Sequence, residues 1–147
     1  MSGWAKVDTK EFEQFAKRVH VEASGGFKND VETSVRKAGD IILREVDART
    51  PVDTGFLRGK WRLTGAGYEH RKFVIKIANS AEYASFVEDG HRQQPGRYVP
   101  ELGKQLKAKW VPGQHMLQEG TDYAMPYAVN VMRKGVEEAA AKIFEGD

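Results

Sequence analysis

The sequence predicts an α+β fold in which long helices pack on a small antiparallel β-sheet, with a long central loop. Residues 31–46 and 127–143 carry apolar side chains at the spacing of an amphipathic helix. Residues 59–64 and 71–78 instead alternate between apolar and polar side chains, as strands with one buried face do. Residues 91–113 show no sustained period and contain several glycines, prolines and cations, which is typical of a long loop.

The length of 147 residues favours a single domain. We expect an N-terminal helix over 8–23, a main helix over 29–50, the sheet and long loop over 56–111, and a C-terminal helix over 122–144. The chain has no cysteine, which excludes a disulfide framework and thiolate chemistry. No apolar run approaches the roughly 20 residues that a membrane span requires, so no membrane partner is expected.

The N-terminal helix has a start signal and a stop signal. Asp8 and Glu11 form a capping-box pattern, and the pair Gly25-Gly26 provides a flexible joint at the other end. Between these signals the apolar residues recur at helical spacing: Phe12, Phe15, Ala16 and Val19. The pattern predicts an amphipathic helix that is connected to the main helix by the glycine pair.

The two other helices are also marked by caps and apolar stripes. Asn29 or Asp30 is the expected cap of the main helix, and Thr121 or Asp122 that of the C-terminal helix. The main helix is expected to bury Val31, Val35, Ala38, Ile42 and Val46. The C-terminal helix is expected to bury Tyr127, Val131, Gly135 or Val136, Ala139 and Ile143, and Met116 and Leu117 are expected to be buried before it.

The strands are expected to form a hairpin. Trp61 and Leu63 share one face of the first strand, and residues 65–67, Gly-Ala-Gly, are the expected turn. The second strand places three apolar side chains on one face: Phe73, Ile75 and Ile77. One or two helical turns follow over 82–88, and two short strands are expected at 98–100 and 108–111.

A corner over residues 48–58 connects the main helix to the sheet. Pro51 cannot continue the helix, because it lacks an amide N–H and its ring clashes with the preceding turn. Asp53 and Thr54 can bond back to nearby backbone amides, and Gly55 can supply a positive φ before a strand begins at Phe56. The residues of this predicted structural turn are Pro51, Val52, Asp53, Thr54, Gly55, Leu57 and Arg58.

Charge is unevenly distributed along the chain. Residues 58–109 hold eleven Lys and Arg against five Asp and Glu, although the whole chain has a net charge of only +2. Such a basic middle suits a polyanion or a complementary neighbouring subunit. One alternative is therefore a DNA-contacting module in which the loop 91–113 binds phosphates through its cations and stacks its aromatic rings on bases. The residues concerned are Arg92, Arg97, Tyr98, Lys104, Lys107, Lys109 and Trp110.

No catalytic, cofactor-binding or metal-ligating residue is predicted. The four histidines lie far apart in the sequence, and none belongs to a metal-binding motif. Asp53 and His91 are the only hints of a hydrolase, which is the weaker alternative, because Asp53 is explained by turn capping. We therefore expect a protein that is not an enzyme and needs no cofactor.

Three marks give the chain a resemblance to a known phage family. The first is the corner, where Pro51-Val52-Asp53-Thr54-Gly55-Phe56-Leu57-Arg58 separates a long helix from a strand with a tryptophan. The second is the segment 83–91, Tyr-Ala-Ser-Phe-Val-Glu-Asp-Gly-His. The third is 112–117, which leads into the final helix and has His-Met-Leu where the family has an aromatic-proline pair. The set resembles the tail-component or tail-completion family of lambdoid and PBSX-like phages.

The resemblance implies a structural virion protein at the head–tail junction, or a part of a phage-tail-like particle, assembled in the bacterial host cytoplasm. Members of that family form rings, commonly sixfold, between the connector or stopper and the tail terminator or tail tube. A neighbouring subunit or genomic DNA would then face the basic middle. Arg58 is expected to pair with an acid, Glu88 or Asp89, of its own subunit or of a neighbouring one. The candidate subunit-interface residues are Glu88, Asp89, His91, Arg92, Arg97, Tyr98, Lys107, Lys109 and Trp110.

Overall fold

The fold is α+β, as the sequence predicts. The structure is a computed structural model that describes residues 13–14, 17–18, 20–21, 25–52, 55–70, 72–100 and 103–145. The predicted N-terminal helix over 8–23 therefore lies largely outside the described residues, as do Asp53 and Thr54 of the corner. The described elements are α2 (Phe27–Arg49), a 3-10 turn η2 (Arg58–Lys60), β1 (Trp61–Glu69), β2 (Lys72–Asn79), α3 (Ala84–Asp89), β3 (Gly90–Arg92), β4 (Tyr98–Val99), β5 (Lys104–Gln105), β6 (Trp110–Pro112) and α4 (Met116–Phe144).

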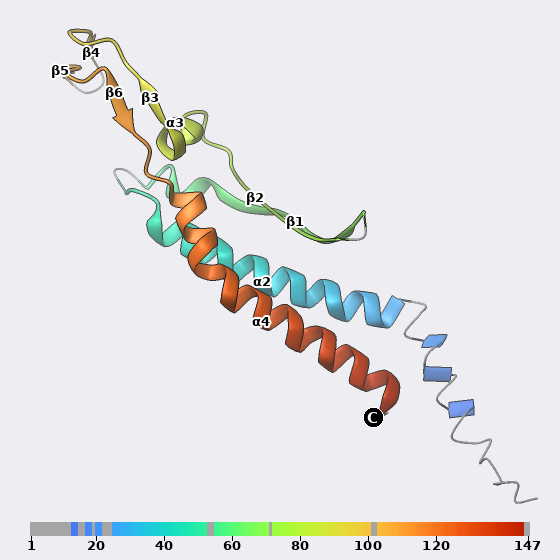
Figure 1. The fold of residues 1–147 in the computed structure, drawn as a ribbon. Coiled ribbons are helices and arrows are strands. Elements are labelled where there is room, and N and C mark those ends of the chain that lie inside the picture. Colours follow the sequence, from blue (N-terminus) through green and yellow to red (C-terminus); the bar gives the residue numbers. More distant parts are fainter. Residues whose placement is uncertain are drawn as a thin grey trace, which may run out of the picture.

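Helices α2 and α4 run antiparallel and form the long axis of the body (Figure 1). The predicted stripe of α2 is confirmed, since its buried residues include Val31, Val35, Ala38, Ile42 and Val46. At the far end of the pair, Lys142 Nζ lies 2.7 Å from Asp30 Oδ2, which joins the last turn of α4 to the first turn of α2.

The contact face of α4 differs from the predicted one. Its buried residues are small except for the first: Met116, Gly120, Ala124, Ala128, Gly135 and Ala139. A Cβ atom added to Gly120 would lie 2.6 Å from the Cα of Val46, so the two backbones approach too closely for larger residues. Tyr127, predicted to be buried, is 56% exposed. The predicted burial of Met116, Gly135 and Ala139 is confirmed. For Tyr127 the prediction was wrong, because it assumed that the largest side chains of a helix face the core.

The hairpin β1/β2 lies on α2 (Figure 1). Its strands pair antiparallel from Trp61 opposite Asn79 to Glu69 opposite Lys72, with a bulge between Leu63 and Gly65. Residues 65–67 thus belong to β1 rather than to the turn, and His70, with a φ of 49°, lies at the actual turn. The predicted register of the second strand is confirmed, because Phe73, Ile75 and Ile77 line one apolar surface.

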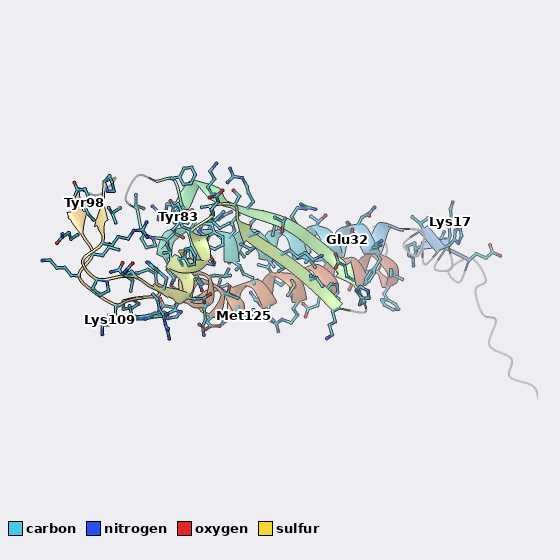
Figure 2. All side chains as sticks on the ribbon, turned by 90° about the horizontal axis from the view of Figure 1, so that it is seen from above. Lys17, Glu32, Tyr83, Tyr98, Lys109 and Met125 are labelled. Atoms are coloured by element: carbon cyan, nitrogen blue, oxygen red, sulfur yellow. The ribbon has the colours of Figure 1, made fainter. Side chains whose placement is uncertain are left out.

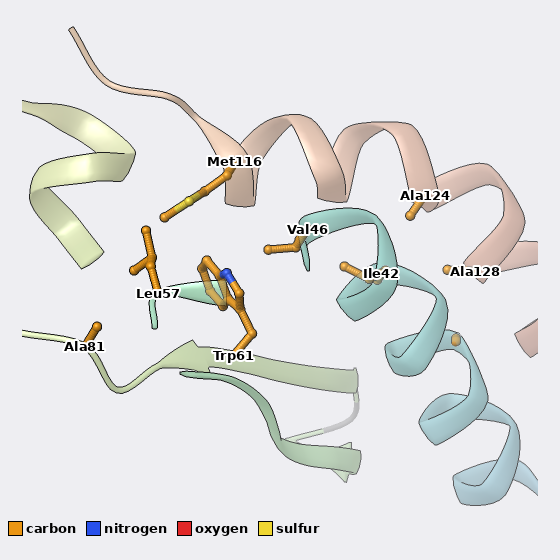
Figure 3. Packing of buried hydrophobic residues seen from close by; sticks show 9 residues of the cluster. Ile42, Val46, Leu57, Trp61, Ala81, Met116, Ala124 and Ala128 are labelled. Atoms are coloured by element: carbon orange, nitrogen blue, oxygen red, sulfur yellow. The ribbon is translucent and has the colours of Figure 1, made fainter. Parts of the chain in front are cut away.

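The larger of the two buried clusters includes the meeting point of the corner, the hairpin and the start of α4 (Figure 3). The smaller one, of Val31, Val35 and Ala139, lies between α2 and α4. Met116 is fully buried against Leu57 and Trp61, and Val46 approaches from α2. The strand begins at Trp61 instead of Phe56, since Gly59 N donates to Gly55 O at 2.9 Å and the chain makes η2 first. Phe56 consequently points outward, whereas Leu57 enters the core.

The sequence predicts one small sheet, but the remaining strands do not join the hairpin. The described strands form three separate two-stranded pieces: β1 with β2, β3 with β6, and β4 with β5. The last two pieces extend from the body as one projection, with α3 at its base (Figure 1). We call residues 90–112 the β-arm; Tyr98 and Lys109 lie on it, at the opposite end of the molecule from Lys17 (Figure 2).

Candidate functional site at the corner and the β-arm

The corner is held together by one threonine hydroxyl. Thr50 ends α2 and is buried, and its Oγ1 donates to the carbonyl of Val46 at 2.8 Å. The same oxygen accepts a hydrogen bond from Trp61 Nε1 at 2.7 Å. A buried indole N–H without an acceptor would be costly, so this hydroxyl couples the end of the helix to the start of the strand. Thr50 was assigned no such role from the sequence, because its partner Trp61 lies beyond the turn.

Arg58 is also part of the corner, but with a different partner from the predicted one. Its Nε donates to the backbone carbonyl of Asp47 at 2.9 Å and lies 3.3 Å from Asp47 Oδ2. A cation at the C-terminal end of a helix is favoured by the helix dipole. The expected pairing with Glu88 or Asp89 within the subunit is therefore wrong, because α2 provides both the carboxylate and the backbone carbonyl of Asp47 beside the guanidinium.

Glu88 instead caps the N-terminus of α4. Its carboxylate oxygens accept from the backbone amides of Leu117 at 2.8 Å and Gln118 at 3.1 Å. This explains why α4 begins at Met116 rather than after Thr121 or Asp122: the cap comes from α3, far away in the sequence. Backbone bonds from Gln114 to Val87 and from His115 to Glu88 fix the same junction. Glu88 is thus already occupied inside its own chain.

Asn79 completes the corner from the hairpin side. Its Nδ2 donates to the carbonyl of Leu57 at 2.7 Å, and its Oδ1 accepts from the amide of Ala81 at 2.9 Å. A single amide side chain thereby connects the end of β2 to the corner. The sequence offered only a strand-breaking signal at this position.

The β-arm brings together part of the predicted interface set. Arg92, Arg97, Lys109 and Trp110 line one open hollow of about 750 Å³, together with Gln93, Gln94 and Pro95. No lining side chain is acidic. Tyr98 and Lys107 lie on the arm but do not line this hollow. The arrangement can bind an anionic group through three cations and present one aromatic ring beside it.

The base of the arm is aromatic. His91 lies in β3 opposite Val111, and its ring centroid is 5.7 Å from that of Phe86. His91 Nδ1 is buried and has no hydrogen-bond partner among the described residues. Nearby on α3 and the corner, Tyr83 stacks on Phe56 at 6.1 Å, and Lys60 Nζ lies 4.9 Å from the Phe56 ring. These rings form an exposed aromatic surface beside the arm.

The described residues offer no support for hydrolytic chemistry. No three His, Cys, Asp or Glu side chains of the described ranges gather as a metal ion would require. Asp53, one of the two hints, lies outside those ranges. No helix in the described part of the chain is long and apolar enough to cross a membrane.

A protein family model matches more than half of the chain. Residues 13–90 match the HK97-gp10-like family, described as "Bacteriophage HK97-gp10, putative tail-component". The chain belongs to this family. It is accordingly a bacteriophage tail component and a structural part of the virion. The search of curated proteins and the search of solved structures each returned no match.

The matched region ends at the boundary between the body and the β-arm. It covers α2, the corner, the hairpin and α3, and it ends at Gly90, where the β-arm begins. The first mark and nearly all of the second lie inside the matched region, whereas the third, at 112–117, lies outside it. The family core that the match defines therefore includes α2, the corner and the hairpin, whereas the β-arm and α4 lie outside the matched residues.

Proposed function

We propose that the protein is a ring subunit at the head–tail junction of the particle, and that the β-arm reaches an adjacent polypeptide of the ring or of the next ring. The observation that carries this proposal is the arm itself. It leaves the body beyond α3 (Figure 1), and none of its described residues is buried. An isolated two-stranded ribbon is at best marginally stable in water, so a ribbon of this kind gains stability from a partner surface.

The residue types on the arm fit a protein interface. Tyr98 is 56% exposed and Trp110 is 50% exposed, although each could bury a large apolar ring. Tryptophan, tyrosine and arginine dominate the binding energy of interfaces. The arm and the family core are different surfaces, so contacts between copies would be heterologous, and such contacts close into a ring when the rotation permits. A sixfold ring between the connector or stopper and the tail terminator or tail tube is the arrangement we favour.

The test replaces the two rings together. Tyr98→Ser with Trp110→Ser should leave the folded body intact and reduce incorporation into particles at least tenfold, measured as copies per particle by quantitative mass spectrometry. Tyr127→Ser is the matched control, since Tyr127 is an equally exposed ring on α4, outside the arm, and it contacts Tyr123 of the same helix. Symmetry of the junction ring would be read from images of the particle. Normal incorporation of the double variant would refute the role of the arm.

DNA contact is the second candidate, and the hollow of the arm favours it. Three cations and Trp110 surround a space without an acid, which suits phosphates beside a base. If DNA is the partner, affinity should fall steeply with salt, by a slope of about −0.9 for each phosphate contacted in duplex DNA. Arg92→Gln, Arg97→Gln and Lys109→Gln together should flatten that slope. An unchanged slope would remove this candidate, and the ring proposal would stand on the particle assay alone.

A further inference from the structure

An apolar groove lies between the hairpin and α4. It has a volume of about 420 Å³, and its lining is almost entirely apolar: Ile42, Phe73, Ile75, Ile77, Leu117, Thr121, Met125, Ala128 and Met132. β2 and α4 provide the walls, and Ile42 of α2, against which both elements pack, lies between them. Met125, near the middle of the body in Figure 2, is 43% exposed, and Phe73 on the opposite wall is 48% exposed.

The volume and the apolar lining of this groove suit the side chains of an amphipathic helix. Its volume falls in the range of ligand pockets, so it admits a few large side chains rather than a domain. An amphipathic helix that docks in such a groove presents anchors at positions i, i+3, i+4 and i+7. The N-terminal segment of this chain carries that pattern: Phe12, Phe15, Ala16 and Val19.

The described pieces of the N-terminal segment lie away from the groove of their own chain. Arg18 Nε donates to the carbonyl of Ile143 at 3.1 Å, at the last turn of α4, whereas the groove is lined by the part of α4 from Leu117 to Met132. The described pieces at 13–14, 17–18 and 20–21 lead away from the body, at the end opposite to the β-arm (Figures 1 and 2). Within its own copy, Arg18 is therefore held beyond the part of α4 that lines the groove.

We propose that residues 8–23 of one copy dock as a helix into the groove of a neighbouring copy, with Phe12, Phe15, Ala16 and Val19 as the anchors. This inference rests on the proposed ring, which it deepens by naming the contact between subunits. The donor segment and the acceptor groove are different surfaces, so each copy donates to one neighbour and accepts from another. The groove is then filled by this chain's own sequence, repeated around the axis.

Cysteine crosslinking tests the proposal in the full-length chain, which contains no cysteine. Ala16→Cys and Met125→Cys are made as separate variants, mixed in equal amounts and oxidised, both as concentrated purified protein and within particles. A disulfide between them can form only between two copies. Tyr127→Cys replaces Met125→Cys in the control, because Tyr127 is on the same helix and similarly exposed but does not line the groove. We expect at least tenfold more crosslinked dimer with Met125→Cys than with Tyr127→Cys.

Two outcomes would overturn the proposal. One is equal or absent crosslinking for the two acceptors in both samples. The other is a crosslink confined to one chain, detected when the double variant Ala16→Cys with Met125→Cys is diluted into excess cysteine-free protein and still reacts internally. Neither result depends on the β-arm, so this docking can fail while the assay of Tyr98 and Trp110 still supports the ring, and the reverse also holds.

Discussion

At the scale of single residues, the molecule depends on side chains that bond to two elements at once. Thr50 bonds both the end of α2 and the indole of Trp61, at 2.8 and 2.7 Å. Glu88 lies in the last turn of α3 and accepts from two amides at the start of α4. Asn79 connects β2 to the carbonyl of Leu57. Each contact fixes the angle between two elements, and together they hold the junction from which the β-arm extends.

Thr50→Val should destabilise the protein by about 1–3 kcal/mol, because valine keeps the shape but leaves the buried N–H of Trp61 without an acceptor. The measurement is the free energy of unfolding from urea titration. Thr33→Val is the control: its hydroxyl also donates to the carbonyl four residues earlier, at 2.9 Å, but on an exposed surface. Equal stability of the two variants would show that the Trp61 bond does not hold the corner.

At the scale of elements, α4 is built to approach α2 closely. Gly120, Ala124 and Ala128 recur every four residues on one face, and all of them are buried. Larger apolar side chains, among them Tyr123 and Met125, are consequently placed on the outer faces of the helix. A helix with small residues toward its own chain and large ones outward buries little apolar surface by itself. The outer faces therefore remain available for other polypeptides.

Gly120→Ala should destabilise the protein by about 1–3 kcal/mol, as overpacking does, since the added Cβ would lie 2.6 and 2.7 Å from backbone atoms of Val46 that cannot rotate away. Gly59→Ala is the control, because a Cβ there meets no atom within 4 Å. Urea midpoints compare the two variants. A Gly120→Ala midpoint as high as that of Gly59→Ala would mean that the helices separate without cost.

The elements that the sequence predicts well are those whose signals are local. The stripe of α2, the stop at Pro51 and the alternating Phe73, Ile75 and Ile77 depend on neighbours in the chain. The start of α4 could not be predicted in this way, because its capping carboxylate, that of Glu88, lies 29 residues before Leu117. The packing of Gly120, Ala124 and Ala128 was likewise hidden, since alanine and glycine give a weak periodic signal beside exposed tyrosines.

The arm residues of the candidate site could be predicted from the sequence, but their arrangement in space could not. Cations and rings on the β-arm were identified from composition, and four of them do line one hollow. Their relative placement follows from the pairing of β3 with β6, which joins residues from both ends of the predicted loop. The groove on β2 and α4 was not found, because no single segment shows that two apolar faces flank an open space.

At the scale of the whole molecule, the described chain is a rod with unlike ends. The β-arm extends from one end, and the pieces of the N-terminal segment leave from the other (Figure 1). Of the two buried clusters, the larger lies between these ends, near the corner. The smaller, of Val31, Val35 and Ala139, lies between α2 and α4 farther from the arm. A subunit of this shape has its stable part in the middle and its proposed contacts at the extremities. Its stability should therefore vary strongly along the chain.

Hydrogen exchange should reveal this gradient in the free protein. Amides of α2 and of the buried face of α4 should exchange at least about a thousandfold more slowly than those of the β-arm, because local opening of a ribbon with no buried residue costs little compared with global unfolding. Mass spectrometry of peptides from 90–100 and 103–112 gives the rates, and peptides from the hairpin serve as the internal reference. In assembled particles the arm should become protected to the level of the hairpin, since its partner then covers Tyr98 and Trp110. Full protection of the arm in the free monomer, unchanged on assembly, would contradict the view that the arm needs a partner.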